Sequence, residues 1–434
     1  MRIAHVTDCY LPRLGGIELQ VHDLAQRQAE VHDVTIFTTT VGPDSLPRLE
    51  GGQVVRVSPP RGDAEKIRYR SSQRGRSPVL SGDYDVVHVH ASSFSPYAFL
   101  AAHDASLRGI PTVATVHSLW AKATPLFRGA DLLAGWGDWP VIFSAVSNAA
   151  AASARKILGA RSPVIILPNG IDPEVWRVAH DGGRPGELRL AVVSRLAHRK
   201  RILPLLEMLM AVRRQLPDSY RLSVEILGDG PQRPQVERYV ARHSMDWVQL
   251  RGRCSRADIR STFARSDLFV APAKLESFGI AALEARCAGL PIIALSGTGV
   301  EDFVVHGREG WLVESDRAMI ETISSLARSP ELVGRVAAHN RAVPPSISWP
   351  EVLRRCDALY RRAALMHGRP WPALRAADDT AGPSRSGQQH GGHSGSRTPR
   401  AVGQALNARS VGRLQEQRPV NGTVGEADPV VSER

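Results

Sequence analysis

Short apolar runs alternate with longer amphipathic segments along the first part of the chain. The runs predicted to be strands are Ile3–Thr7, Val34–Thr38, Val54–Val57, Val86–His90, Thr112–Val116 and Val141–Val146, with helices at Ile17–Glu30 and Tyr97–Arg108. Buried strands that alternate with helices are typical of an open parallel sheet covered on both faces. A further run, Val164–Leu167, leads into the turn-rich Pro168–Pro173, which we interpret as a hinge.

A second series of the same kind follows this break. Its predicted strands are Leu188–Val193, Ser223–Leu227, Val248–Leu250, Leu268–Ala271 and Pro291–Ala294, with helices near Ile202–Gln215 and Ile280–Ala288. Trp349-Pro350 opens a last amphipathic helix, Glu351–Met366. We therefore expect an α/β protein in which two doubly wound domains face each other across a cleft.

The same patterns give the predicted domain boundaries. We expect an N-terminal domain at residues 1–168, a C-terminal domain at 169–348, a final helix at 349–366 and a tail at 367–434. Gly, Ser, Pro, Gln and Arg dominate the tail, and large apolar residues nearly vanish from it. Such a segment buries too little surface to offset its ordering entropy, so we expect it to be disordered.

Composition narrows the class of protein. The chain of 434 residues is 43% hydrophobic and 23% charged, which is ordinary for a globular protein, and it has no apolar run long enough to span a bilayer. We expect no signal peptide, because an apolar strand begins almost at Met1. Four scattered cysteines form no CxxC pair, which indicates a reducing cytoplasm without a disulfide framework or zinc site.

The net charge of +12 suggests an anionic partner, although an Arg-rich composition accounts for it equally well. Nucleic acid is disfavoured, because aromatic residues are only 6% of the chain and the basic residues lie in predicted loops. Arg61–Arg76 carries six basic residues against two acidic ones. This segment is either a solvated loop or a contact with an anionic membrane surface.

The most specific motif contains two carboxylates eight positions apart, Glu276 and Glu284. They flank Gly279, where a loop after the predicted strand Leu268–Ala271 turns into a helix. The carboxyl end of a parallel strand is where open sheets bind ligands, and a helix N-terminus offers free N–H groups to a phosphate. Without a Cβ, Gly279 lets the backbone approach that phosphate closely. The carboxylates suit sugar and ribose hydroxyls; the alternative is two solvated glutamates.

A basic turn, Ser194–Lys200, directly follows the strand Leu188–Val193. The guanidinium group of Arg195 can bind a phosphate through two parallel hydrogen bonds, and Lys200 adds a compact positive charge. Both suit a diphosphate leaving group, whose developing negative charge must be neutralised. The alternative is a basic turn that faces water. Two glycine-rich turns are weaker signals: Pro12–Glu18, which contains Gly15-Gly16 but not the GxGxxG fingerprint, and Gly228–Pro231.

Together these motifs resemble the retaining glycosyltransferase family 4, which has the GT-B fold of two Rossmann-like domains. The resemblance covers about residues 1–366. It includes the family's E-x7-E pair, its Arg…Lys donor-phosphate pair and its N-terminal Gly-Gly loop. His117 falls where the family has an active-site histidine, Asn169–Asp172 resembles the interdomain connection, and Trp349-Pro350 resembles the start of the helix that crosses back to the N-terminal domain.

The resemblance implies a role for each candidate residue. The expected catalytic residues are His117 and Glu276; the donor-phosphate site is Gly15, Gly16, Arg195, Lys200, Phe278 and Gly279; the nucleoside site is Gly228, Arg253, Cys254 and Glu284. It also implies that the acceptor binds the N-terminal domain and that a donor phosphate oxygen takes the acceptor's proton. Two departures are Val31-His32, where the family usually has Gly-His, and Arg201, where it usually has glycine after the Arg…Lys pair.

We therefore expect an enzyme that moves a hexose from a nucleotide diphosphate sugar to a hydroxyl group of a lipid, glycan or small molecule. We expect it in the cytoplasm, either free or peripheral at the inner face of the membrane. GDP-mannose is slightly preferred, because the basic N-terminal half resembles bacterial lipid mannosyltransferases. The alternatives are a UDP-sugar-dependent glucosyl or N-acetylglucosaminyl transferase and a catalytically silent scaffold that binds nucleotide sugars. We expect no cofactor and no metal: no DxD motif stands before a plausible phosphate site, and His88 and His90 are expected to have no third ligand nearby.

Overall fold

The computed structural model describes residues 1–42, 48–57, 83–120, 127–129, 131, 135–159 and 162–371, all within one compact unit. The basic segment Arg61–Arg76 and residues 372–434 of the predicted tail lie outside the described residues. No helix in the described ranges is long and apolar enough to cross a bilayer.

The N-terminal half is built on a sheet of seven parallel strands in the order β3-β2-β1-β4-β5-β6-β7. The strands are β1 Arg2–Thr7, β2 Asp33–Thr38, β3 Gly52–Arg56, β4 Val86–Ala91, β5 Thr112–Val116, β6 Ile142–Ala145 and β7 Val164–Ile166. The three central strands β1, β4 and β5 consist almost wholly of buried residues, because helices cover both faces of the sheet. This burial explains the continuous apolar runs in the sequence.

The C-terminal half repeats the design with six parallel strands in the order β10-β9-β8-β11-β12-β13. The strands are β8 Glu187–Val193, β9 Arg221–Leu227, β10 Val248–Gly252, β11 Leu268–Ala271, β12 Ile292–Leu295 and β13 Gly310–Val313. In each sheet the chain winds outward in one direction and then in the other. The switch points lie between β1 and β4 and between β8 and β11, and an open sheet binds its ligands beside such a point.

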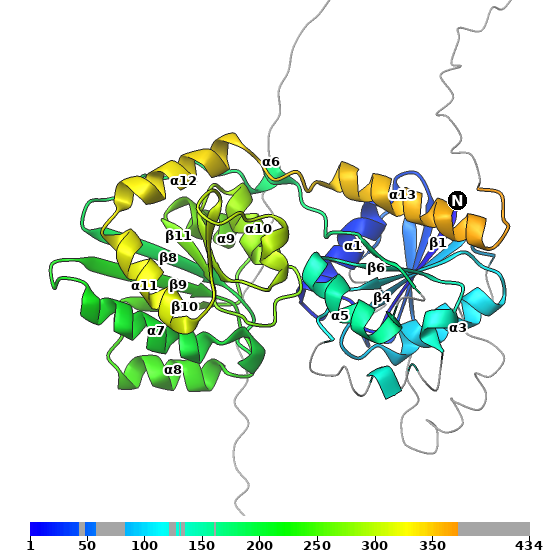
Figure 1. The fold of residues 1–434 in the computed structure, drawn as a ribbon, viewed down its shortest axis with the longest axis horizontal. Helices are drawn as coiled ribbons and strands as arrows, with labels where there is room; N and C mark the ends of the chain where they lie inside the picture. The colour runs from blue at the N-terminus through cyan, green and yellow to red at the C-terminus, as the bar shows by residue number, and fades with distance from the viewer. Residues whose placement is uncertain are drawn as a thin grey trace, which may run out of the picture. The chain divides into compact units, whose positions relative to one another are not determined.

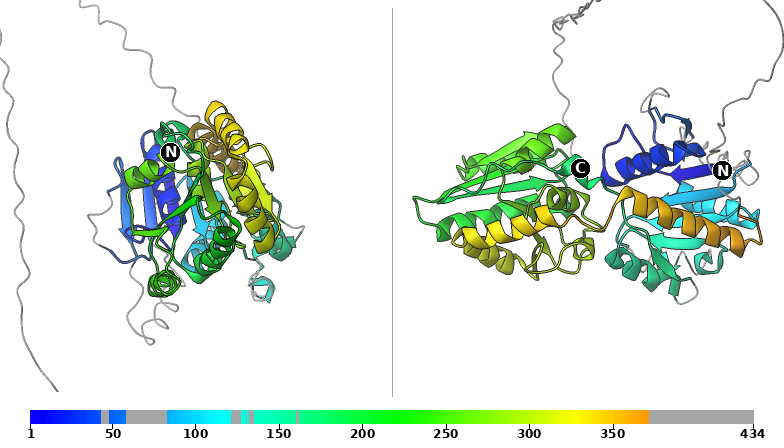
Figure 2. Two further views of the ribbon diagram at one scale, coloured as in Figure 1. Left: turned by 90° about the vertical axis from the view of Figure 1, so that its left-hand side faces the viewer. Right: turned by 90° about the horizontal axis from the view of Figure 1, so that it is seen from above.

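Helices form the outer layers around both sheets (Figure 1, Figure 2). They are α1 Gly16–Ala29, α3 Pro96–Leu107, α5 Asn148–Leu158, α6 Pro173–Trp176, α7 Ile202–Gln215, α8 Arg233–Arg242, α9 Arg256–Ala264, α10 Ile280–Cys287, α11 Asp316–Ala327, α12 Pro330–Ala342 and α13 Trp349–Met366. The predicted doubly wound α/β fold is confirmed. The sequence analysis does not predict α5, α6, α8, α9, α11, α12 or strand β13.

The last helix, α13, follows the C-terminal sheet in the chain but packs on the N-terminal one, beside α1 (Figure 1). Its buried residues Trp349, Val352 and Cys356 belong to the same apolar cluster as Ile3 of β1 and Val86 of β4. The guanidinium group of Arg27 also lies 4.3 Å above the ring of Trp349. The expected helix that crosses back is therefore present, and it stabilises the N-terminal core by burying one apolar face.

Candidate active site

A cleft at the carboxyl ends of the strands of both sheets is lined by every residue that the sequence analysis placed in the site. They are Gly15, Gly16, His117, Arg195, Lys200, Gly228, Arg253, Cys254, Glu276, Phe278, Gly279 and Glu284. They come from loops after β1, β5, β8, β9, β10 and β11 and from the first turns of α1 and α10. Widely separated motifs therefore meet in one place, and their individual roles remain predictions.

An ion pair joins two of the predicted site residues. Lys200 Nζ lies 2.5 Å from Glu276 Oε2, and the two side chains are only 22% and 17% exposed. Lys200 ends the short turn His198–Lys200 after β8, while Glu276 lies on the loop after β11, so the pair bridges the switch point of the second sheet. The pair keeps both charges in the cleft at a low desolvation cost.

Arg195 is exposed on the same side of the cleft. Within the described part of the chain, no carboxylate lies at ion-pair distance from its guanidinium group. An unpaired arginine fork at the carboxyl end of a strand is suited to bind a phosphate in two-pronged geometry. Lys200, in contrast, would have to share its charge between Glu276 and a bound phosphate.

The loop that carries Glu276 ends at the N-terminus of α10. Gly279 precedes this helix with a left-handed φ of 91°, and a Cβ built on it would lie 2.7 Å from Val300 Cγ2. Only glycine fits this turn without strain. Phe278 is 2% exposed and packs against Phe303, which anchors the turn. The free N–H groups of the first turn of α10 therefore face the cleft from a rigid position.

The second carboxylate of the motif, Glu284, lies on α10 and is partly buried. Burial raises the pKa of its carboxyl group to about 8, and the charge of nearby Arg256 opposes part of this rise. The carboxyl group therefore keeps its proton at pH values well above those at which a free glutamate ionises. A neutral carboxyl can both donate to and accept from vicinal hydroxyl groups.

Two further turns, after β9 and β10, form another edge of the cleft. Gly228 has a φ of 135°, and a Cβ there would lie 1.9 Å from the carbonyl oxygen of Ser194, so a side chain would force β8 and β9 apart at their ends. Arg253 is exposed and Cys254 is partly buried, with its thiol 3.5 Å from the carbonyl oxygen of Gly252. This edge offers mainly backbone polar groups to a ligand.

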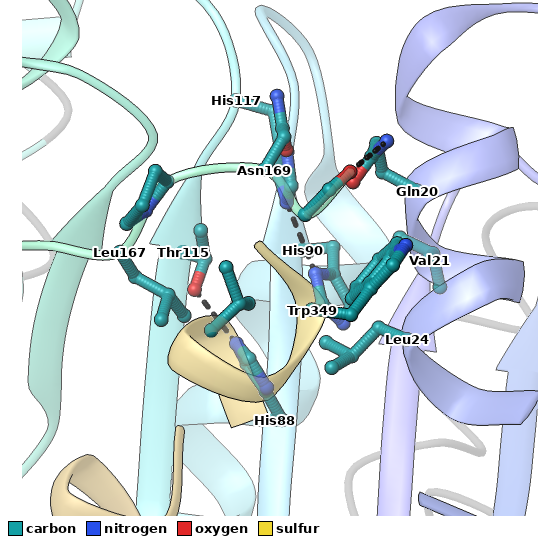
Figure 3. A pocket seen from close by; sticks show the side chains of 13 residues that line it. Gln20, Val21, Leu24, His88, His90, Thr115, His117, Leu167, Asn169 and Trp349 are labelled. Carbon is teal, nitrogen blue, oxygen red and sulfur yellow. Dashed lines mark hydrogen bonds between the residues drawn. The ribbon is translucent and has the colours of Figure 1, made fainter. Parts of the chain in front are cut away.

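His117 follows β5 and is only 7% exposed. Its Nε2 lies 3.0 Å from Nδ1 of His90, whereas its buried Nδ1 has no hydrogen-bond partner among the described residues (Figure 3). Burial lowers the pKa of His117 to about 4, so the imidazole is neutral at neutral pH. It can therefore donate or accept one hydrogen bond in the cleft but carries no charge there.

The N-terminal Gly-Gly loop contains a residue to which the sequence analysis assigned no role. Glu18, in the first turn of α1, lines the cleft and is 4% exposed; its Oε1 lies 3.1 Å from Nε of Arg13. A Cβ on Gly15 would meet the Glu18 carboxylate at 2.4 Å, so Gly15 makes room for this side chain. The position of Glu18 within Pro12–Glu18 was the only signal for it in the sequence.

The expectation that His88 and His90 have no third histidine nearby was wrong. His5 of β1 lies beside them, and ligand atoms of His5, His88 and His90 lie within 4.8 Å of one another. Parallel pairing places His5 opposite His88 in the register. Every ring nitrogen of the three, however, already has a hydrogen-bond partner in a side chain. The cluster is therefore a hydrogen-bonded network, and a metal would have to break it.

Two family profiles match the chain. "Glycosyltransferase Family 4" matches residues 14–175, and "Glycosyl transferases group 1" matches residues 180–342. The chain is 28% identical to one subunit of the phosphatidylinositol N-acetylglucosaminyltransferase of Arabidopsis thaliana, over 84% of this chain and 82% of that protein. It is 26% identical to a phosphatidyl-myo-inositol mannosyltransferase of Mycobacterium tuberculosis, over 84% and 97%.

A solved structure with the same architecture is that of Anabaena HepE in complex with UDP and glucose. It superimposes with a TM-score of 0.67 and 18% identity, covering 82% of this chain and 98% of that one. This likeness supports the two-domain GT-B architecture and carries no information on the ligands of this chain.

Proposed function

Since this chain belongs to glycosyltransferase family 4 and is a glycosyltransferase with the GT-B fold, we propose that it transfers a hexose from a nucleotide diphosphate sugar with retention of configuration. The observation that carries this proposal is the meeting of all the predicted site residues in one cleft. In this reaction the bond between the anomeric carbon and the donor's phosphate oxygen breaks. A new bond to the acceptor oxygen forms on the same face, and the nucleoside diphosphate leaves.

The donor's diphosphate is proposed to lie between Arg195, Lys200 and the N-terminus of α10, with Gly15 and Gly16 opposite. Arg195 has no carboxylate partner in the described residues, and the amide groups behind Gly279 add a positive dipole end. Positive groups fixed before reaction stabilise the charge that develops on the leaving diphosphate. The nucleoside would lie along Gly228, Arg253 and Cys254, with its ribose hydroxyls on Glu284.

The sugar is proposed to lie beside Glu276 and His117. The Glu276 carboxylate can accept hydrogen bonds from sugar hydroxyls, and its pairing with Lys200 holds it in place at 2.5 Å. With a pKa of about 4, His117 is a weak base, and we assign the proton of the acceptor hydroxyl to a donor phosphate oxygen. Glu276 and His117 thus orient the sugar, and the geometry of binding supplies most of the rate enhancement.

We propose phosphatidylinositol or a related inositol lipid as the acceptor, and GDP-mannose as the donor. Both curated relatives described above are named for transfer to phosphatidylinositol, one of mannose and the other of N-acetylglucosamine. The N-terminal wall of the cleft also exposes apolar side chains: Leu14 is 51% exposed and Phe94 is 78% exposed. Such side chains suit a lipid better than a small polyol. The alternative is a UDP-N-acetylglucosamine donor.

We further propose that the enzyme works without a bound metal, in the cytoplasm and in peripheral contact with an anionic membrane. The net charge of +12 favours this contact. Binding to vesicles that contain an anionic lipid, compared with neutral vesicles of the same size, tests it. Equal binding to both kinds of vesicle would argue against the contact.

Calorimetric titration with GDP, UDP, ADP and their sugar conjugates tests the donor site. We expect one nucleotide to bind selectively, and Glu284→Ala and Arg195→Ala to weaken it by about 10-fold or more, since each removes a charged or hydrogen-bonded contact. Arg335→Ala removes an exposed arginine of α12 outside the cleft and serves as the control. Absence of nucleotide binding to folded protein would reject the donor site. Transfer of the labelled sugar to phosphatidylinositol, but not to free inositol, would identify the acceptor.

A further inference from the structure

A chain of buried hydrogen bonds leads from the cleft to the middle of helix α13. It starts at His117, whose Nε2 lies 3.0 Å from His90 Nδ1 (Figure 3). His90 Nε2 lies 2.9 Å from His5 Nδ1, and His5 Nε2 lies 2.7 Å from Gln28 Oε1. Gln28, on the last turn of α1, is 4% exposed, and His5 and His90 are 0% and 2% exposed. Water therefore does not interrupt the chain.

A second branch leaves the same amide group. Gln28 Nε2 donates to the hydroxyl of Tyr360 at 3.1 Å, and that hydroxyl lies 2.9 Å from His88 Nδ1. His88 Nε2 then lies 2.7 Å from the Thr115 hydroxyl, which lies 2.7 Å from the Ser144 hydroxyl. The Gln28 amide is thus the junction between two branches, and each ring nitrogen of His5, His88 and His90 is used.

The direction of each hydrogen bond follows from the chemistry of the rings. Burial lowers the pKa of His5 and His117 to about 4 and that of His88 and His90 well below its usual range, so all four rings are neutral. A neutral imidazole has one N–H donor and one acceptor nitrogen. Once the protonated nitrogen of one ring is known, the hydrogen bond to the next ring determines which nitrogen of that ring is protonated.

Gln28 is the residue that sets this direction. Its Oε1 can only accept, so His5 carries its proton on Nε2 and accepts at Nδ1. His90 must then donate from Nε2, and His117 must donate from Nε2 to His90. The remaining nitrogen of His117, Nδ1, is left as an acceptor. It is buried, and in the described part of the chain nothing is hydrogen-bonded to it. His117 lines both the cleft and the small cavity beneath it (Figure 3).

We propose that Gln28 is a positioning residue that fixes, through His5 and His90, the Nε2-protonated tautomer of His117, so that Nδ1 of His117 accepts a hydrogen bond from a hydroxyl group of the bound sugar. The identity of that hydroxyl rests on the proposed function; the tautomer does not. In the opposite arrangement of protons, Nδ1 would be a donor and could not accept a bond from that hydroxyl. The network therefore selects which polar group of a ligand can dock against His117.

Nitrogen-15 NMR of the full chain, labelled at histidine, tests the proposal, because the two tautomers have different ring-nitrogen shifts. Single histidine substitutions assign the signals. We expect His5, His90 and His117 to be protonated on Nε2 at neutral pH without ligand. Gln28→Met, which has a similar length but no amide, should give His117 a mixture of tautomers and lower kcat by about 10-fold or more. Gln20→Met removes another amide of α1, bonded to the Gly170 carbonyl, and should leave the tautomers unchanged.

Gln28→Glu gives a second, sharper readout and serves if the methionine variant does not fold. Burial raises the pKa of the new carboxyl group, so the variant is measured at a pH at which this group is ionised. Both oxygens then accept, so His5, His90 and His117 should keep their tautomers and kcat should be largely restored. The Tyr360 hydroxyl must now donate to the carboxylate, so His88 should move its proton from Nε2 to Nδ1. An unmodified protein with His117 protonated on Nδ1 would overturn the proposal, as would tautomers that do not respond to either variant. If the tautomers respond but neither the unmodified protein nor any variant transfers sugar, the role of Gln28 in setting the tautomers is supported and the proposed function fails.

Discussion

At the scale of single residues, Arg201 shows how a departure from the family pattern is accommodated. It adopts left-handed φ and ψ angles of 59° and 38°, as a glycine would, immediately before α7. Its guanidinium group is bonded to both carboxylate oxygens of Asp316, at 2.9 and 2.5 Å, and to the carbonyl oxygen of Pro272. These bonds offset the backbone strain of a side chain in this conformation, so the loop keeps its shape without glycine.

We predict that Arg201→Gly is more stable than Arg201→Ala by about 1 kcal/mol, the reverse of the usual order, because both variants lose the ion pair and only glycine relieves the strain of the left-handed backbone. Urea unfolding of the two variants and of the unmodified protein measures the difference. Asp316→Asn, which keeps the arginine and weakens only the ion pair, is the matched control. An alanine variant as stable as the glycine variant would show that the left-handed turn is not strained.

Glu284 gives a prediction on pH. The pKa of its carboxyl group is raised from 4.5 to about 8 by burial, so the folded protein holds a proton that the unfolded chain releases above pH 4.5. Stability from this group is complete below pH 4.5 and is lost as the pH rises to about 8. We expect Glu284→Gln, which needs no proton, to be more stable than the unmodified protein at pH 8 by about 2–4 kcal/mol. Thermal unfolding without nucleotide across this range measures it; parallel curves would contradict the raised pKa.

At the scale of elements, the sequence predicts best what is buried on both faces. Strands such as β4 and β5 are buried along their whole length because helices cover both sides of their sheet, and they are accordingly rich in valine and alanine. Helix α8 escaped prediction because Val236 is its only buried residue, so hardly any apolar period exists to detect. Local sequence carries information on burial, and where burial is slight the element is set by tertiary contacts.

The candidate site also divides into residues with a local sequence signal and residues without one. Sequence spacing was enough to predict four of them: Glu276, Glu284, Arg195 and Lys200. The place of His5 beside His88 could not, because it depends on β1 pairing with β4 across more than eighty residues of chain. The parallel register of β1 and β4, rather than any motif, puts His5 of one strand within reach of His90 of the other. Long-range pairing of this kind leaves no trace in periodicity or spacing.

At the scale of the whole molecule, two parallel sheets of similar topology contribute different kinds of side chain to one cleft. The C-terminal half supplies Arg195, Lys200 in its ion pair with Glu276, and the N-terminus of α10. The N-terminal half supplies the neutral His117 and the exposed apolar residues Leu14 and Phe94. In the proposed function, Arg195, Lys200 and the helix N-terminus would supply the positive charge that a divalent cation provides in many phosphate sites.

We accordingly predict that thorough removal of divalent metal leaves sugar transfer unchanged within about twofold, since the leaving diphosphate is neutralised by fixed groups of the chain. The measurement is direct transfer of labelled sugar after treatment with a chelator, compared with protein given added magnesium or manganese. Elemental analysis of the purified protein checks the His5–His88–His90 cluster at the same time: its ring nitrogens are all hydrogen-bonded, so we expect less than stoichiometric zinc. Activity that is lost with the chelator and restored by a divalent cation would contradict the proposed charge balance. Stoichiometric zinc would instead mean that the histidine network is a metal site.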